Sequence, residues 1–75
     1  MDKSNNSSER NIFLYGEITE TVADKIVYKL LELDRENNKS PINFFINSPG
    51  GSVTSGLAIL DTLQYILPHT EVRTI

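Results

Sequence analysis

The stretch Ile46-Asn47-Ser48-Pro49-Gly50-Gly51-Ser52-Val53 joins an apolar run to a helical pattern. Pro49 fixes its own φ and biases Ser48 toward extended geometry, so a strand must end here. Gly50 and Gly51 have no Cβ, so they can adopt backbone angles closed to other residues and let another molecule approach the main chain. The stretch therefore predicts a strand, a tight glycine turn and a helix in succession.

The turn is expected to gather backbone N–H donors at the start of that helix. Ser52 or Thr54 can cap the helix with its side-chain oxygen. The remaining N–H groups then lie at the positive end of the helix dipole, where an anion or a developing oxyanion is stabilised. The alternative is a turn that serves geometry alone, as a tight connection between strand and helix.

The segment before the turn predicts one strand and one helix. A near-continuous apolar run over residues 11–18 suits a strand buried on both faces, and Gly16 within it indicates a bend or a close contact. From Thr21 to about Asn37 the apolar residues recur at helical spacing, which predicts an amphipathic helix that starts at Thr19 or Thr21.

Three further elements follow. Residues 42–47 form a predicted second strand, residues 54–67 a second helix closed by Pro68, and residues 72–75 the start of a third strand. Strands and helices that alternate in this order predict the α/β class, with βαβ units, a parallel sheet and right-handed crossovers.

Length and charge limit the function classes. The chain has 75 residues, no cysteine and a net charge of −3, so it offers one small domain over residues 10–75 without a disulfide. Its seven basic residues are scattered among acids, which argues against a nucleic-acid partner. Residues 1–9 are expected to be a polar, flexible tail without the apolar core of a signal peptide, and no later segment is long enough to span a membrane. A cytoplasmic location is therefore expected.

Several familiar motifs are incomplete. Residues 51–56 have the glycine spacing of a phosphate-binding loop, but Leu57 and Ala58 stand where that motif needs lysine and then serine or threonine. No GxGxxG motif follows the first strand, so dinucleotide binding is not expected. Ser52 lacks the final glycine of a nucleophile elbow, and a capping role is favoured for its hydroxyl.

The titratable residues do not form an evident catalytic set. His69 is the only histidine, and a lone imidazole in a connecting loop is usually solvated. Asp61 lies in the second predicted helix, and nothing in the sequence pairs it with His69. No cluster of His, Asp or Glu has the spacing of metal ligands, so no metal site is expected.

The run PINFFINSPGGSVTSGLAILDTLQYI over residues 41–66, with NIFLYGEI at 11–18 upstream, resembles the proteolytic subunit of Clp-type ATP-dependent serine peptidases. The resemblance extends from about Arg10 to Ile75 and combines the NSPGG turn with GLAI, DT and QYI at the expected intervals. It implies a crotonase-like fold, of which this chain holds an incomplete β-α-β-α-β segment from the amino-terminal portion.

The resemblance implies roles for the residues of the turn. In such peptidases the second glycine of the turn donates its N–H to the tetrahedral oxyanion, which maps to Gly51, and Gly50 supports the turn. The backbone that follows pairs with an extended substrate, which maps to Ser52 and Val53 and is a form of β-augmentation.

The resemblance also implies partners. The subunits form stacked rings, and an AAA+ ATPase unfoldase docks in an apolar cleft between subunits and delivers unfolded polypeptide. Aromatic residues of that cleft map to Phe45 and Tyr65, whereas Asn43 departs from the family pattern, which often has an aromatic residue there. ATP is used by the partner alone, and no cofactor is expected in this chain.

The catalytic serine, histidine and aspartate of the family fall beyond the segment that this chain matches. A lone oxyanion donor does not hydrolyse a peptide, so the chain as given is expected to be inactive. Three alternatives stay open: a truncated, non-catalytic subunit that binds intact subunits and alters their assembly, a fragment of a signal-peptide peptidase A-type enzyme with a similar turn and a lysine base, and a nonenzymatic crotonase-fold binding module.

Overall fold

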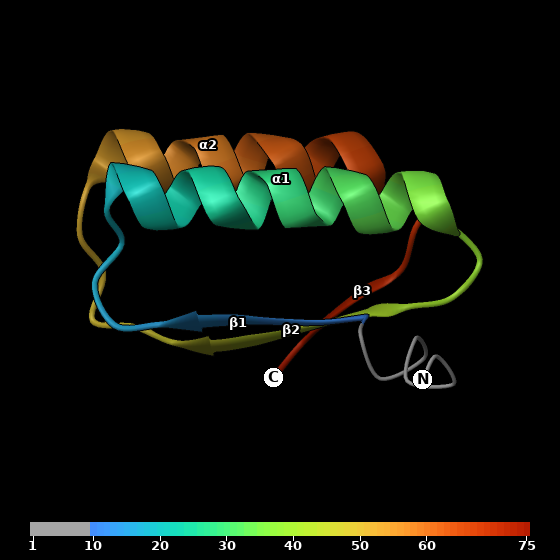
Figure 1. Cartoon of the computed structure of the whole chain (residues 1–75), viewed down its shortest axis with the longest axis horizontal. Helices are drawn as coiled ribbons and strands as arrows, with labels where there is room; N and C mark the ends of the chain where they lie inside the picture. Colours follow the sequence, from blue (N-terminus) through green and yellow to red (C-terminus); the bar gives the residue numbers. More distant parts are fainter. Residues whose placement is uncertain (1–9) are drawn as a thin grey trace.

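A computed structural model describes residues 10–75, which form an alternating β-α-β-α-β unit (Figure 1). The elements are β1 (Asn11–Tyr15), α1 (Glu20–Glu36), β2 (Ile42–Asn47), α2 (Val53–Ile66) and β3 (Val72–Thr74). The predicted α/β class and order are confirmed, and apart from the end of β1 each boundary lies close to its expected position. The tail predicted for residues 1–9 lies outside the described residues.

The three described strands form a parallel sheet in the order β1-β2-β3. Both helices cover the same face of this sheet, which is the arrangement that two crossovers of the same hand produce (Figure 1). The other face has no cover within residues 10–75. We call it the outer face of the sheet.

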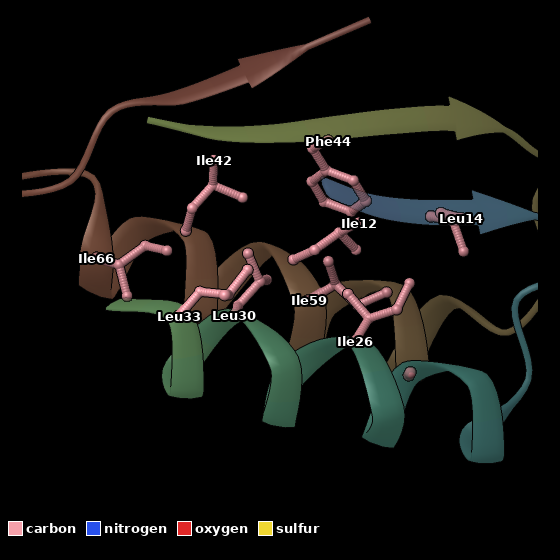
Figure 2. Packing of buried hydrophobic residues seen from close by; sticks show 10 residues of the cluster. Ile12, Leu14, Ile26, Leu30, Leu33, Ile42, Phe44, Ile59 and Ile66 are labelled. Atoms are coloured by element: carbon pink, nitrogen blue, oxygen red, sulfur yellow. The ribbon is translucent and has the colours of Figure 1, made fainter. Parts of the chain in front are cut away.

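The core lies between the sheet and the two helices. Its members are buried aliphatic side chains and one buried phenylalanine, drawn from β1, β2 and both helices (Figure 2): Ile12, Leu14, Ala23, Ile26, Leu30, Leu33, Ile42, Phe44, Ile59 and Ile66. This single layer of apolar contacts fixes the helices over the sheet, and it thereby sets the position of the turn between β2 and α2.

The prediction that the first strand reaches Ile18 and is buried on both faces is wrong. β1 ends at Tyr15, because Gly16 turns the chain with a φ of +81°. Ile12 and Leu14 point into the core, whereas Phe13 and Tyr15 are exposed on the outer face. The apolar run is continuous because the outer face is aromatic, not because both faces are buried.

The helix ends are held by specific side chains. Thr19 caps α1 and accepts a hydrogen bond from the backbone of Val22, so of the two predicted caps it is Thr19 that serves. At the other end of α1, the buried guanidinium of Arg10 donates to the carbonyls of Leu33, Asn37, Ser40 and Pro41, over 2.6–3.3 Å. Arg10 therefore ties the start of β1 to the end of α1.

Candidate functional site

The turn between β2 and α2 adopts a backbone that requires glycine. Gly50 has a φ of +106° and Gly51 a φ of +154°, both in a region that L side chains rarely adopt. A Cβ on Gly51 would lie 2.4 Å from the carbonyl oxygen of Ile18 and 2.8 Å from its nitrogen. Gly51 therefore has a second, steric reason to be glycine, because its main chain is packed directly on that of Ile18.

Backbone hydrogen bonds hold the turn against the segment after β1. Ile18 N–H donates to the carbonyl of Gly50 at 2.9 Å, and Ser52 N–H donates to the carbonyl of Ile18 at 2.9 Å. Within the turn, Gly50 N–H donates to Ser48 Oγ at 3.0 Å. These bonds form an isolated parallel bridge between Ile18 and Gly51, so the turn is fixed from two sides.

Gly51 N–H is the donor that this network leaves free. Within residues 10–75 it has no hydrogen-bond acceptor, and Gly51 is exposed. It lies just before α2, whose cap is Ser52: the Ser52 hydroxyl accepts from Ser55 N–H at 3.2 Å. The predicted capping role of Ser52 is confirmed. The arrangement presents a fixed, exposed N–H beside the positive end of a 14-residue helix.

Ser52 and Val53 are not an open strand edge in this structure. The N–H of Ser52 is bonded to Ile18, and its carbonyl accepts from Gly56 N–H at 2.9 Å. Val53 is already the first residue of α2. Pairing of a substrate with the N–H of Ser52 would require its bond to Ile18 to open, so the substrate-binding role of these two residues stays a prediction.

Comparison with known proteins identifies the family. A family model described as Clp protease matches residues 2–75. The chain belongs to the Clp protease family. The resemblance of the NSPGG turn and its neighbours to Clp-type subunits is therefore confirmed.

Similar curated proteins are Clp protease subunits from Borreliella and Borrelia species. The ATP-dependent Clp protease proteolytic subunit 1 of Borreliella burgdorferi is 54% identical over 67 residues, which cover 89% of this chain and 34% of that protein. The ATP-dependent Clp protease proteolytic subunits of Borrelia garinii subsp. bavariensis and Borreliella afzelii are also 54% identical over 67 residues, or 89% of this chain, and are covered to 34% and 33%. This Clp protease chain thus spans about a third of the length of these relatives.

Phe45 and Tyr65, the two residues predicted to receive an ATPase, lie in separate places on this Clp protease chain. Phe45 is on the outer face of the sheet, where its ring stacks on that of Phe13 with centroids 4.9 Å apart. Tyr65 is an exposed residue of α2, edge-on to the ring of His69. One chain does not bring these aromatic residues together, so a cleft that contains both needs two chains.

His69 has a carboxylate partner that the sequence did not reveal. Its Nε2 lies 2.9 Å from Oδ1 and 3.1 Å from Oδ2 of Asp34, and the buried Thr70 hydroxyl donates to the same Asp34 Oδ1. The expectation that a lone loop imidazole is merely solvated is therefore wrong, although His69 stays exposed. Asp61 forms no hydrogen bond or ion pair with His69 within residues 10–75.

The environment of Asp34 changes its acidity. Burial acts to raise the pKa of Asp34, but the hydrogen bonds from Thr70 and His69 and the charges of His69 and Arg10 outweigh burial, so the pKa lies below its usual value. This cluster joins α1 to the loop before β3. No nucleophilic side chain of residues 10–75 is hydrogen-bonded to His69, and we assign the cluster a structural role.

A shallow groove of about 560 Å³ lies between α1 and α2 and is lined by Leu31, Asp34, Arg35, Asp61, Thr62 and Tyr65. In residues 10–75, no three His, Asp or Glu side chains come close enough to hold a metal ion. Neither helix of this region is both long and apolar enough to cross a membrane. The glycine turn is the best-defined candidate site.

Proposed function

We propose that this Clp protease chain is the part of an ATP-dependent serine endopeptidase subunit that binds the oxyanion formed during peptide-bond hydrolysis. The supporting observation is the N–H of Gly51, which is exposed, free of any acceptor in residues 10–75, and fixed by the bonds between Ile18 and the turn. A donor already held in place stabilises developing charge without reorganisation. Gly50 supports the turn through its positive φ.

The sheet indicates where a nucleophile would approach Gly51. β3 is parallel to β2, so the carboxyl ends of both strands point toward the same edge of the sheet. Thr74 of β3 lies opposite Phe44 of β2. If β3 continued in the same register, the residue about three positions after Thr74 would lie opposite Asn47, next to the turn. A serine just after such a strand would lie near Gly51.

The chain by itself is proposed to be inactive. The Ser52 hydroxyl is committed to capping α2, and the His69 imidazole is hydrogen-bonded to Asp34. Hydrolysis needs a nucleophile and a base within hydrogen-bond reach of each other. We propose that an intact subunit supplies these groups without a cofactor and assembles with other copies in stacked rings in the cytoplasm. An AAA+ ATPase that docks in a cleft between subunits, lined by Phe45 and Tyr65, is proposed to deliver unfolded polypeptide to these rings.

One observation favours a second, non-catalytic function. The outer face carries exposed aromatic side chains, Phe13 and Tyr15, that a parallel sheet normally covers. A chain with such a face could bind intact subunits and alter their assembly. Co-purification of this chain with intact subunits, with no change in peptidase activity per active site but a change in ring size, would favour this second function.

The proposed oxyanion role is tested in a chimera. This chain replaces the matched region of the Borreliella burgdorferi subunit, and hydrolysis of a fluorogenic peptide is measured. Glycolic acid incorporated in place of Gly51 removes the N–H without adding a Cβ. We expect kcat to fall about 100-fold or more, as for the loss of one oxyanion donor.

The same replacement at Gly50 is the matched control, because it removes an N–H that is bonded to Ser48 rather than free. It should change kcat far less. A chimera whose kcat is unaffected by the replacement at Gly51, while its assembly is normal, would exclude the proposed role.

A further inference from the structure

The outer face of the sheet carries a row of polar side chains that crosses all three described strands. Arg73 of β3 lies opposite Asn43 of β2, which lies opposite Asn11 of β1. Residues in register share a face, and Ile42 and Phe44 on either side of Asn43 are buried in the core. Asn11, Asn43 and Arg73 therefore stand on the outer face, opposite the face that both helices cover (Figure 1). We call these three residues the polar row.

The stacked rings of Phe13 and Phe45 form an aromatic row directly beside the polar row. Ile75 extends it, because its N–H donates to the carbonyl of Phe44 at 2.9 Å and its carbonyl accepts from Ile46 N–H at 3.1 Å, which places it opposite Phe45. Ile75 is 65% exposed. Along each strand the two rows are two residues apart, or about 7 Å.

Arg73 has hydrogen-bonding groups that the described residues do not use. Its Nε donates to Oε2 of Glu71 at 3.0 Å, whereas its Nη1 and Nη2 have no acceptor in residues 10–75. The Arg73 side chain is 57% exposed. A guanidinium held through Nε presents its two Nη groups as a fork, which suits the two oxygens of a carboxylate. Glu71 thus orients the guanidinium and leaves this fork open.

The two asparagines also keep free groups. Asn43 Nδ2 donates to Asn11 Oδ1 at 3.0 Å, which leaves Asn11 Nδ2 and Asn43 Oδ1 without a partner in residues 10–75. Burial of an amide or a guanidinium without a hydrogen-bond partner is costly. An occupant that covers both rows with apolar atoms alone is therefore disfavoured, and a basic side chain would meet the like charge of Arg73.

We propose that the polar row makes the docking surface around Phe45 selective for an ATPase segment that carries an acidic side chain beside its apolar anchor. The proposal rests on the proposed function, in which the ATPase docks at a cleft lined by Phe45. The apolar anchor packs on the aromatic row, and the carboxylate accepts hydrogen bonds from Nη1 and Nη2 of Arg73. The spacing of the two rows suits an anchor and an acid two positions apart in an extended segment.

The test measures binding, not hydrolysis, so its failure is distinguishable from failure of the proposed oxyanion role. The protein is the assembled chimera in which this chain replaces the matched region of the Borreliella burgdorferi subunit. The probes are fluorescein-labelled, C-terminally amidated peptides of about 12 residues. They share a central leucine and carry aspartate, asparagine or lysine two positions after it. In fluorescence anisotropy, we expect the aspartate peptide to bind about tenfold more tightly than the asparagine peptide, and the lysine peptide to bind most weakly.

Arg73→Gln should remove the preference for aspartate while the asparagine peptide still binds, because the aromatic row is unchanged. Lys25→Gln is the matched control. Lys25 is an exposed cation on α1, in the layer on the other side of the sheet, and its loss should leave the preference unchanged.

Several results would overturn the proposal. They are the absence of binding by every peptide, equal affinities for the aspartate and asparagine peptides, a preference that survives Arg73→Gln, and an equal loss of preference with Lys25→Gln. A preference that appears only when the C-terminal amide is replaced by a free carboxylate would also overturn it, because Arg73 would then select a chain terminus rather than an acidic side chain.

Discussion

At the scale of single residues, the two glycines of the turn differ in what surrounds them. Gly50 has open space where a Cβ would lie, whereas a Cβ on Gly51 would overlap the backbone of Ile18. We expect Gly50→Ala to cost about 1–2 kcal/mol from its positive φ alone, and Gly51→Ala about 3 kcal/mol or more because backbone overlap is added. Urea unfolding followed by circular dichroism measures both, and equal losses would contradict the geometry of the turn.

A second residue-scale prediction concerns Asp34. Its pKa is lowered in the folded state, so it contributes stability above the pKa of an unfolded aspartate, and this contribution is lost as the pH falls through the folded pKa. We expect Asp34→Asn to cost about 1–2 kcal/mol near neutral pH, with the difference from the original chain vanishing in acid.

The matched control for Asp34 is Asp24→Asn, at an exposed position on the same helix. It should have little effect at any pH. A difference between Asp34→Asn and the original chain that stays constant down to about pH 2 would show that the carboxylate charge is not what stabilises the cluster.

At the scale of elements, α1 depends on a side chain from outside the helix. The Arg10 guanidinium satisfies carbonyls at the end of α1 and in the loop that follows, and it places a positive charge at the negative end of the helix dipole. We expect Arg10→Met to cost about 2–4 kcal/mol, because buried carbonyls lose their donors. Arg10→Lys should recover part of this loss, since an ammonium cannot reach all the acceptors together. Thermal unfolding of the three chains checks the order.

Apolar spacing predicted the elements well because each pattern is local. Within β2, Ile42 and Phe44 face the core while Asn43 and Phe45 lie on the outer face. Ser52 stands directly before α2 as its cap. Both features depend only on neighbouring residues. In the sequence, Arg10 is only one of several scattered charges, because its acceptors are backbone carbonyls and no sequence pattern marks them. The pairing of Asp34 with His69 and Thr70 joins residues 35 and 36 positions apart, and a crossover brings them together.

For the candidate site too, some features could be predicted from the sequence and others could not. The positive φ at Gly50 and Gly51 follows from their place between a proline and a helix cap, and it could be predicted. The packing of Gly51 on Ile18 could not be predicted. The apolar run predicts a regular strand through Ile18, whereas the chain turns at Gly16 and pairs again only in the single bridge between Ile18 and Gly51. The free N–H of Gly51 follows from that bridge, so the strongest support for the site is a tertiary feature.

At the scale of the whole molecule, the outer face is arranged in rows across the sheet. Asn11 and Asn43 lie opposite each other and are joined by a side-chain hydrogen bond of 3.0 Å. The next outward pair is Phe13 and Phe45, whose rings stack. Because residues in register share a face, the register of a parallel sheet gathers these side chains into one polar row and one aromatic row. Asn43, which departs from the family pattern, thus has its own partner in Asn11.

This aromatic row leads to the last prediction. Parallel sheets are normally covered on both faces, and exposed apolar patches promote association. We therefore expect the 75-residue chain to self-associate as its concentration rises from about 10 to 300 μM. The double variant Phe13→Thr, Phe45→Thr should stay monomeric in sedimentation velocity, since threonine suits a strand without offering a ring. The control Tyr28→Thr removes an exposed ring from α1 and should leave association unchanged. A chain that is monomeric throughout this range, or that responds equally to the loss of Tyr28, would mean that the outer face alone does not bind another copy.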